Sequence, residues 1–218
     1  MAPFDLAQTD KLLTTTRAVR KRLDLTRPVP RELVLECIQL STQAPTGGNF
    51  PRARWVVVDD PQLKHELADL YRKGYAPYMA AQKEAIKRAG RPGMERILES
   101  SDHLAQVMHE VPVMAIPCGL DRLPADPPPG VAQGYYGSLM PAVWSFMLAA
   151  RSRALGTVFT TLHLAHEREA AALLGIPSTV TQLGLVPVAY YTGDDFKPGQ
   201  RRPADQITYW NEWKRAAS

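Results

Sequence analysis

Three short segments of this 218-residue chain carry the side chains best suited to chemistry. Residues 11–31 hold seven of the 26 lysines and arginines but only one of the 22 acidic residues, so the net charge of +4 is concentrated there. The second segment is a Thr-Gly-Gly-Asn loop at 46–49, and the third is a basic cluster of Lys197, Arg201 and Arg202. Arginine binds phosphate through a bidentate fork, so the two basic clusters favour an anion site. A solvated basic surface is the alternative.

The loop at 46–49 follows Pro45 and precedes an apolar run at 55–58. A plain turn between a helix and a strand would explain its proline and glycines. Glycine also lets the backbone approach a flat ring closely. Asn49, one of two asparagines in the chain, offers both hydrogen-bond donors and an acceptor. With the basic clusters, the loop favours a site for a phosphate-bearing organic cofactor.

Familiar catalytic motifs are absent from the sequence. It contains no dinucleotide-binding or P-loop glycine pattern, no Gly-x-Ser-x-Gly elbow, and no His-Glu-x-x-His or Cys-x-x-Cys. His163 and His166 are a weak candidate for a pair of metal ligands. The acid pairs at 59–60 and 194–195 fall where turns and helix N-caps favour aspartate. No metal site is therefore expected, and an organic cofactor is expected to supply the chemistry.

The composition predicts one globular domain without a membrane segment. Hydrophobic residues make up 45% of the chain and charged residues 22%, enough for one sizeable core. No apolar run reaches the roughly 18 residues of a membrane span, and the N-terminus lacks the pattern of a signal peptide. Cys37 and Cys118 lie far apart in apolar segments, as is typical of reduced core cysteines. We expect a cytoplasmic protein, and the short basic patch without interleaved aromatics argues against nucleic-acid binding.

The hydrophobic pattern predicts a single α+β domain over residues 1–218. Helices are expected at 11–20, 31–43, 60–71, in two pieces over 74–109 separated by 90–93, at 135–151 with a cap at 154–156, and at 167–174. Strands are expected at 55–58, 111–118, 157–161 and 183–191. Pro112 and Pro117 favour strand ends or a sheet edge. The more polar stretch at 74–109 is expected to add little to the core.

Five short segments occur in a distinctive order along the chain. They are Thr16–Arg20 followed by Pro28–Pro30, Ala44–Pro51, Leu148–Thr157, Leu174–Pro177 and Arg202–Pro203. Together they resemble the FMN-dependent nitroreductase family over most of the chain. Ala18 stands where that family usually has serine, and Phe50 and Arg52 stand where it usually has glutamine and tryptophan.

This resemblance implies a mostly antiparallel central sheet flanked by helices in an intertwined homodimer, with FMN at the interface. It also implies an FMN-dependent NAD(P)H oxidoreductase that works by ping-pong hydride transfer at the flavin N5, without a catalytic side chain. The second substrate would be a small aromatic electron acceptor such as a nitroarene or quinone. The cofactor-binding residues that the resemblance implies are Arg17, Ala18, Arg20, Pro45, Thr46, Gly47, Asn49, Thr160, Thr161, Leu162, Arg201 and Arg202.

The excursion at about 71–109 is interpreted as a helical lid, with Tyr71, Tyr75 and Tyr78 as substrate-binding residues. Ordinary packing of these tyrosines onto the domain surface is the alternative. A lid that blocks nicotinamide would instead make a flavin-sequestering protein. A specialised flavoprotein of the dehalogenase or flavin-cleaving type, with little NAD(P)H activity, is the other functional alternative.

The C-terminal segment contains four large apolar residues that a single chain need not expose. They are Ile207, Tyr209, Trp210 and Trp213. A patch of this kind is typical of an interface, which favours a tail that embraces a partner subunit. A terminal helix docked on the chain's own core is the alternative.

Overall fold

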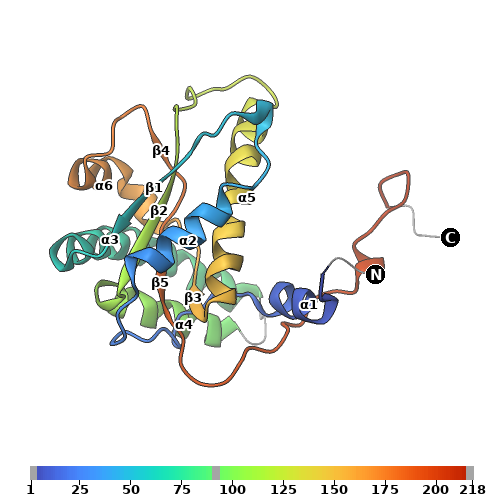
Figure 1. The fold of residues 1–218 in the computed structure, drawn as a ribbon, viewed down its shortest axis with the longest axis horizontal. Coiled ribbons are helices and arrows are strands. Elements are labelled where there is room, and N and C mark those ends of the chain that lie inside the picture. Colours follow the sequence, from blue (N-terminus) through green and yellow to red (C-terminus); the bar gives the residue numbers. More distant parts are fainter. Residues whose placement is uncertain (1–3, 90–93, 215–218) are drawn as a thin grey trace. The chain divides into compact units, whose positions relative to one another are not determined.

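The computed structural model describes residues 4–89 and 94–214, which form two compact units. The larger unit, residues 17–193, contains a five-stranded sheet and most of the helices (Figure 1). The smaller unit joins residues 1–16 to 194–218. Its regular elements are the helix α1 (Leu6–Thr15) and a single 3-10 turn at Ala204–Gln206.

The sheet has the strand order β1-β2-β5-β3, and its strand pairs are antiparallel. Its strands are β1 (Ala53–Val58), β2 (Val113–Gly119), β3 (Leu155–Thr157), β4 (Thr181–Gln182), which pairs with β2, and β5 (Val186–Tyr190). The predicted α+β class with a mostly antiparallel sheet is confirmed.

Pro112 directly precedes β2, which agrees with the predicted strand end. The alternative, a sheet edge, is wrong, because β2 lies between β1 and β5 and all its residues are buried. Proline removes one ladder donor, which a central strand normally needs. Pro117 is accommodated where the neighbour of β2 changes. β5 pairs with β2 as far as Ala115, and β4 pairs with it from Cys118 onward. On that side the Pro117 carbonyl accepts from Leu183 N at 2.8 Å, and no strand residue of the described chain is paired opposite the position where the N–H is missing.

Two helices, α2 (Arg31–Ser41) and α5 (Val131–Ser152), lie across one face of the sheet (Figure 1). Cys37 of α2 and Phe146 of α5 pack there against Ala115 of β2 and Val186 of β5. Cys37 and Cys118 are free and buried. Side chains alternate along a strand, so Met114 points to the opposite face, where it is also fully buried. Both faces of the central strand are thus covered.

The next helix, α3 (Pro61–Ala89), continues well past its predicted end at Tyr71. It runs through Gly74 and Pro77, two residues that often end a helix. Leu67, Tyr71 and Tyr75 recur at helical spacing and are all buried. Burial of this face outweighs the local preference of Gly74 and Pro77.

A shorter helix, α4 (Met94–Val107), follows, and a 3-10 turn at Met108–Glu110 leads into β2. The predicted separator at 90–93 lies outside the described residues. The prediction that 74–109 adds little to the core is wrong, because Met79, Leu104 and Met108 are almost completely buried.

The helix α1 begins and ends five residues earlier than predicted. The Asp5 side chain caps its N-terminus, and after Thr16 the chain becomes extended. Val19 N donates to Thr157 O at 2.9 Å, so the segment after Thr16 is paired with β3. This long-range pairing replaces the last turn that the local pattern predicts.

The other boundaries differ locally. The helix α6 (Glu167–Leu174) ends at Gly175 with φ +65°, as predicted. After α5, however, Ala154 adopts the left-handed conformation, with φ 59°, rather than Gly156. Gly156 lies in β3, where a Cβ would come within 2.9 Å of Val19 Cγ1. The predicted strand at 183–191 is shortened to β5, and β4 precedes it at Thr181–Gln182. The predicted strand at 157–161 leaves the sheet after Thr157.

Candidate functional site

A cavity of about 210 Å³ lies in the larger unit, where Arg20, α3, α4 and the chain after β3 meet. Its lining consists of Arg20, Tyr71, Tyr75, Tyr78, Ser101, Leu104, Val158, Phe159, Thr160, Thr161 and Leu162. Four predicted cofactor residues and all three predicted substrate residues are therefore brought together. Sequence reasoning missed the α4 residues Ser101 and Leu104, because nothing in their local pattern marks the face that α4 turns toward α3.

Pairing with β3 places Arg20 at the cavity. Ala18 bridges Thr157, and the neighbouring Val19 side chain is buried against Gly156. Arg20 is half-buried and lies beside the residues that follow Thr157. Arg17 and Ala18 are exposed and do not line the cavity. The lining thus contains one cationic side chain, Arg20, together with the hydroxyls of Thr160 and Thr161, a donor set suited to an anionic ligand.

The three tyrosines lie on one face of α3, at positions i, i+4 and i+7. The rings of Tyr71 and Tyr75 are stacked, with centroids 6.0 Å apart, while Tyr78 is half exposed. Burial raises the pKa of Tyr71, and the adjacent Thr160 side chain and the Arg20 charge act in the opposite direction. These neutral aromatic rings next to Arg20 form a surface suited to a flat, electron-poor ligand.

A carboxylate on α4 holds Tyr75. Tyr75 Oη donates to Asp102 Oδ1 at 2.6 Å, and Lys83 Nζ lies 3.9 Å from Asp102 Oδ2. Burial and the Asp102 carboxylate both raise the pKa of Tyr75. Tyr75 is therefore a neutral phenol whose proton is already engaged.

The remaining wall follows β3 and leads into a 3-10 helix at Leu162–His166. Thr160 is fixed by paired backbone hydrogen bonds with Leu185, of 3.0 and 2.7 Å. α3 packs closely here, because a Cβ on Gly74 would lie 3.0 Å from the Leu162 carbonyl carbon and still closer to its oxygen. The rigid backbone behind Thr161 and Leu162 therefore depends on a glycine in α3.

His163 lies in the 3-10 helix that follows this wall and is completely buried. Neither of its ring nitrogens has a hydrogen-bond partner among the described residues. Burial lowers the pKa of His163 to about 4, and the neighbouring Gln182 and Glu167 act in the opposite direction. Arg122 donates two hydrogen bonds to the Glu167 carboxylate, at 2.7 and 3.0 Å, and lowers the pKa of Glu167. His163 is thus a neutral core residue beside an ion pair.

The Thr-Gly-Gly-Asn loop does not line this cavity within one chain. Gly47 N donates to Ser138 Oγ at 3.0 Å, which fixes the loop on α5. Gly48 and Asn49 both have positive φ, 63° and 53°, and both are exposed, as is Pro45. Thr46 contributes instead to an apolar cavity of about 420 Å³ formed by α2, β1 and α5.

The predicted basic cluster near the C-terminus belongs to the smaller unit. Arg201 and Arg202 are exposed, and Arg201 Nη1 donates to Gln200 O at 2.8 Å. The apolar tail residues of the same unit are also exposed. The rings of Tyr209 and Trp213 are in tilted contact, with centroids 4.9 Å apart and an interplanar angle of 58°. The part of this tail that the structure describes contains no α-helix.

Over residues 4–89 and 94–214, no group of three or more histidine, cysteine or acidic side chains is arranged to hold a metal ion. None of the helices described in these ranges combines the length and apolar character needed to cross a membrane.

Comparison with solved structures identifies similar folds at low sequence identity. Oxidized iodotyrosine deiodinase bound to FMN and 3-iodo-L-tyrosine has a TM-score of 0.68 and 22% identity, covering 92% of this chain and 98% of the other. A BluB-like flavoprotein from Clostridium difficile 630 has a TM-score of 0.70 and 16% identity, covering 96% and 100%. The FMN-dependent nitroreductase NfnB from Mycobacterium smegmatis, in complex with NADPH, has a TM-score of 0.62 and 18% identity, covering 86% and 89%.

A search of curated protein sequences finds no significant match. The family model named "Nitroreductase family", by contrast, matches residues 13–190, which include the entire cavity lining and the loop at 46–49. With this match over most of its length, and a fold shared with other nitroreductase-like proteins, the chain belongs to the nitroreductase family.

Proposed function

We propose that this protein is an FMN-dependent NAD(P)H oxidoreductase that reduces small aromatic acceptors, nitroarenes or quinones, by ping-pong hydride transfer. The observation that carries the proposal is the cavity in which Arg20, two threonine hydroxyls and three tyrosine rings meet. When bound, FMN would take hydride from the nicotinamide at N5 and pass electrons to the acceptor. Among the neighbours described above, iodotyrosine deiodinase is bound to FMN, and NfnB is FMN-dependent and in complex with NADPH.

The residues present fit an FMN cofactor. Arg20, assisted by Arg17, would hold the phosphate, since guanidinium groups form bidentate bonds to phosphate. A role for Arg201 and Arg202, which belong to the smaller unit, stays a prediction. Thr160, Thr161 and the backbone at Leu162 would bind the flavin from one side. No side chain is required as a catalytic acid or base. The task of this chain's residues is to orient the rings, exclude water and stabilise negative charge on the reduced ring.

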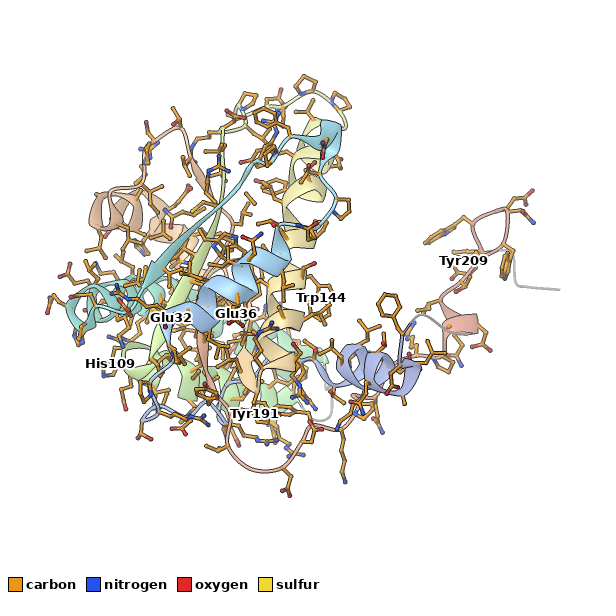
Figure 2. All side chains as sticks on the ribbon, viewed as in Figure 1. Glu32, Glu36, His109, Trp144, Tyr191 and Tyr209 are labelled. Atoms are coloured by element: carbon orange, nitrogen blue, oxygen red, sulfur yellow. The ribbon has the colours of Figure 1, made fainter. Side chains whose placement is uncertain are left out.

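We further propose that the working unit is a homodimer with each site built from both chains. A cavity of about 210 Å³ is smaller than the 300–1,000 Å³ typical of ligand pockets. The loop residues Pro45, Thr46, Gly47 and Asn49 do not line it, so a second chain would have to supply them. Trp144 projects from α5 and is 43% exposed (Figure 2), and the tail residue Trp213 is 80% exposed. These apolar surfaces support an extensive interface.

The burial of two cavity tyrosines supports a second candidate function. Tyr71 and Tyr75 are almost completely buried, and Tyr75 is bonded to Asp102 of α4. A closed cover of α3 and α4 over the cavity would hinder nicotinamide. A flavin-sequestering protein, or a specialised flavoprotein with little NAD(P)H activity, would have such a cover. Two neighbours of this fold, iodotyrosine deiodinase and a BluB-like flavoprotein, support the specialised alternative.

The first experiment is the visible absorption spectrum of the purified protein, followed by release of the cofactor with heat and its chromatography. We expect flavin bands and FMN. Steady-state oxidation of NADH and NADPH, with a nitroarene and a quinone, then separates the two functions. Bound FMN without NAD(P)H oxidation would favour the second function. FAD, or no flavin after reconstitution, would end the proposal. A cytoplasmic location remains a prediction.

A further inference from the structure

The Tyr75–Asp102 pair determines which hydrogen bonds the cavity can offer a ligand. A tyrosine hydroxyl has one proton to donate and lone pairs that accept. The Tyr75 hydroxyl donates a hydrogen bond to Asp102 Oδ1 across 2.6 Å, the short distance of a charge-assisted bond to a carboxylate. An ionised carboxylate cannot return a proton to Tyr75. Towards a ligand, the Tyr75 oxygen can therefore act only as a hydrogen-bond acceptor.

The pair is held firmly from both sides. Tyr75 is 8% exposed and stacks on Tyr71, which fixes its ring. Asp102 Oδ2 also faces Lys83 Nζ across 3.9 Å, so the carboxylate has a second partner besides Tyr75. Burial and the carboxylate raise the pKa of Tyr75, so the phenol keeps its proton and keeps it directed at Asp102. The two residues come from α3 and α4, so the bond also joins the two helices that cover the cavity.

We propose that Asp102 is a positioning residue that makes Tyr75 a hydrogen-bond acceptor in the cavity, so that the site favours aromatic acceptors carrying an O–H or N–H donor. This inference rests on the proposed reduction of nitroarenes or quinones and narrows that class. A bare nitro group or quinone carbonyl offers only lone pairs, which Tyr75 cannot satisfy. A hydroxyl or amine substituent on the same ring can donate to the Tyr75 oxygen.

The test compares 4-nitrobenzyl alcohol with its methyl ether, which keep the same reducible nitro group and differ in one hydroxyl proton. The quantity measured is the ratio of the two kcat/KM values, alcohol over ether, for the flavin-loaded protein. Because the ether is also larger, the ratio in Tyr75→Phe serves as the baseline without the phenol oxygen. We expect the wild-type ratio to exceed that baseline by about 2- to 10-fold, the worth of one net hydrogen bond.

Asp102→Ala and Asp102→Leu separate the role of the carboxylate from that of the phenol. In Asp102→Ala the Tyr75 hydroxyl no longer has Asp102 as its acceptor and can donate to either probe, so the ratio should fall toward the Tyr75→Phe baseline. Asp102→Leu fills the space of the carboxylate if the alanine variant folds poorly, and it offers no acceptor either, so the ratio should also fall. Glu99→Gln is the matched control on α4, because Glu99 pairs with the exposed Lys21 at 3.2 Å and does not line the cavity. It should retain the wild-type ratio.

A second readout is independent of turnover. Ligand-observed NMR with benzyl alcohol and benzyl methyl ether, neither of which is reducible, compares binding to the same variants. Equal ratios in wild type and Tyr75→Phe would overturn the inference, as would a wild-type ratio in both Asp102 variants. Failure of the proposed function looks different. No acceptor would be reduced at all, while the NMR comparison would still show whether Tyr75 distinguishes the two probes.

Discussion

Gly74→Ala is the sharpest test of how α3 supports the cavity wall. A Cβ at this position would lie 3.0 Å from the Leu162 carbonyl carbon and closer still to its oxygen. Ordinary carbon contacts are about 3.5–4.0 Å, so α3 and the turn at Leu162–His166 would have to separate by something on the order of 1 Å. The obstacle is backbone and cannot rotate away. The thermodynamic cost should therefore lie near the upper end of the range for overpacking, about 3 kcal/mol.

Part of this cost is offset, because alanine is a better helix former than glycine by about 1 kcal/mol. The net loss of unfolding free energy is then about 2 kcal/mol. For a domain of this size, each kcal/mol shifts Tm by about 2–4 °C, so Gly74→Ala should melt about 4–8 °C below wild type. FMN content should fall as well, because Thr161 and Leu162 move with the turn.

Gly137→Ala is the matched control. Gly137 also lies inside a helix, α5, but a Cβ there would meet no atom within 4 Å. Gly137→Ala should therefore gain only the higher helix propensity of alanine, and the variant should melt about 2–4 °C above wild type. Differential scanning calorimetry of both variants gives the comparison. If Gly74→Ala melts at or above wild type, the close approach of α3 to Leu162 is refuted.

Three further predictions follow from the same geometry. Arg20→Ala should weaken FMN binding by about 10- to 150-fold, the worth of one charge-assisted bond, with Lys21→Ala as control; an unchanged dissociation constant would remove Arg20 from the site. Burial lowers the pKa of His163 in the folded state to about 4, from an ordinary value of 6.5, so the stability that the neutral imidazole contributes is present above pH 6.5 and is lost as the pH falls toward 4. That loss is about 3 kcal/mol, and urea titrations should show less acid sensitivity in His163→Phe; equal sensitivity would contradict it. Light scattering at micromolar concentration should give twice 24.2 kDa, and an FMN-loaded monomer would disprove the shared site.

Helices are predicted correctly from the sequence where the hydrophobic periodicity and the signals for the helix ends agree. Glu167–Leu174 was recognised because an apolar face ends at Gly175, which adopts the left-handed conformation that glycine allows. The apolar run around Phe146 likewise predicts the helix α5, in which Phe146 is fully buried. Arg20 and Thr160–Leu162 were identified through the family resemblance, and they line one cavity although they are distant in the sequence.

The errors share a physical cause, which is contact between segments far apart in the chain. α1 stops before Arg17 because the following residues pair with Thr157, which local propensity cannot register. α3 continues through Gly74 because the glycine is required by Leu162, nearly ninety positions away. Asp102 was overlooked as a site residue because its role exists only when α4 packs against Tyr75.

Thr46 explains why dimer formation and cofactor binding should be one event rather than two. It belongs both to the loop predicted to contact FMN and to the apolar cavity formed by α2, β1 and α5. The loop is anchored to α5 through Gly47 N and Ser138 Oγ, so it cannot move independently of that surface. A partner that covers the apolar cavity would therefore meet the loop at the same time. Dilution that separates the chains should release FMN, and FMN should in turn stabilise the dimer by mass action.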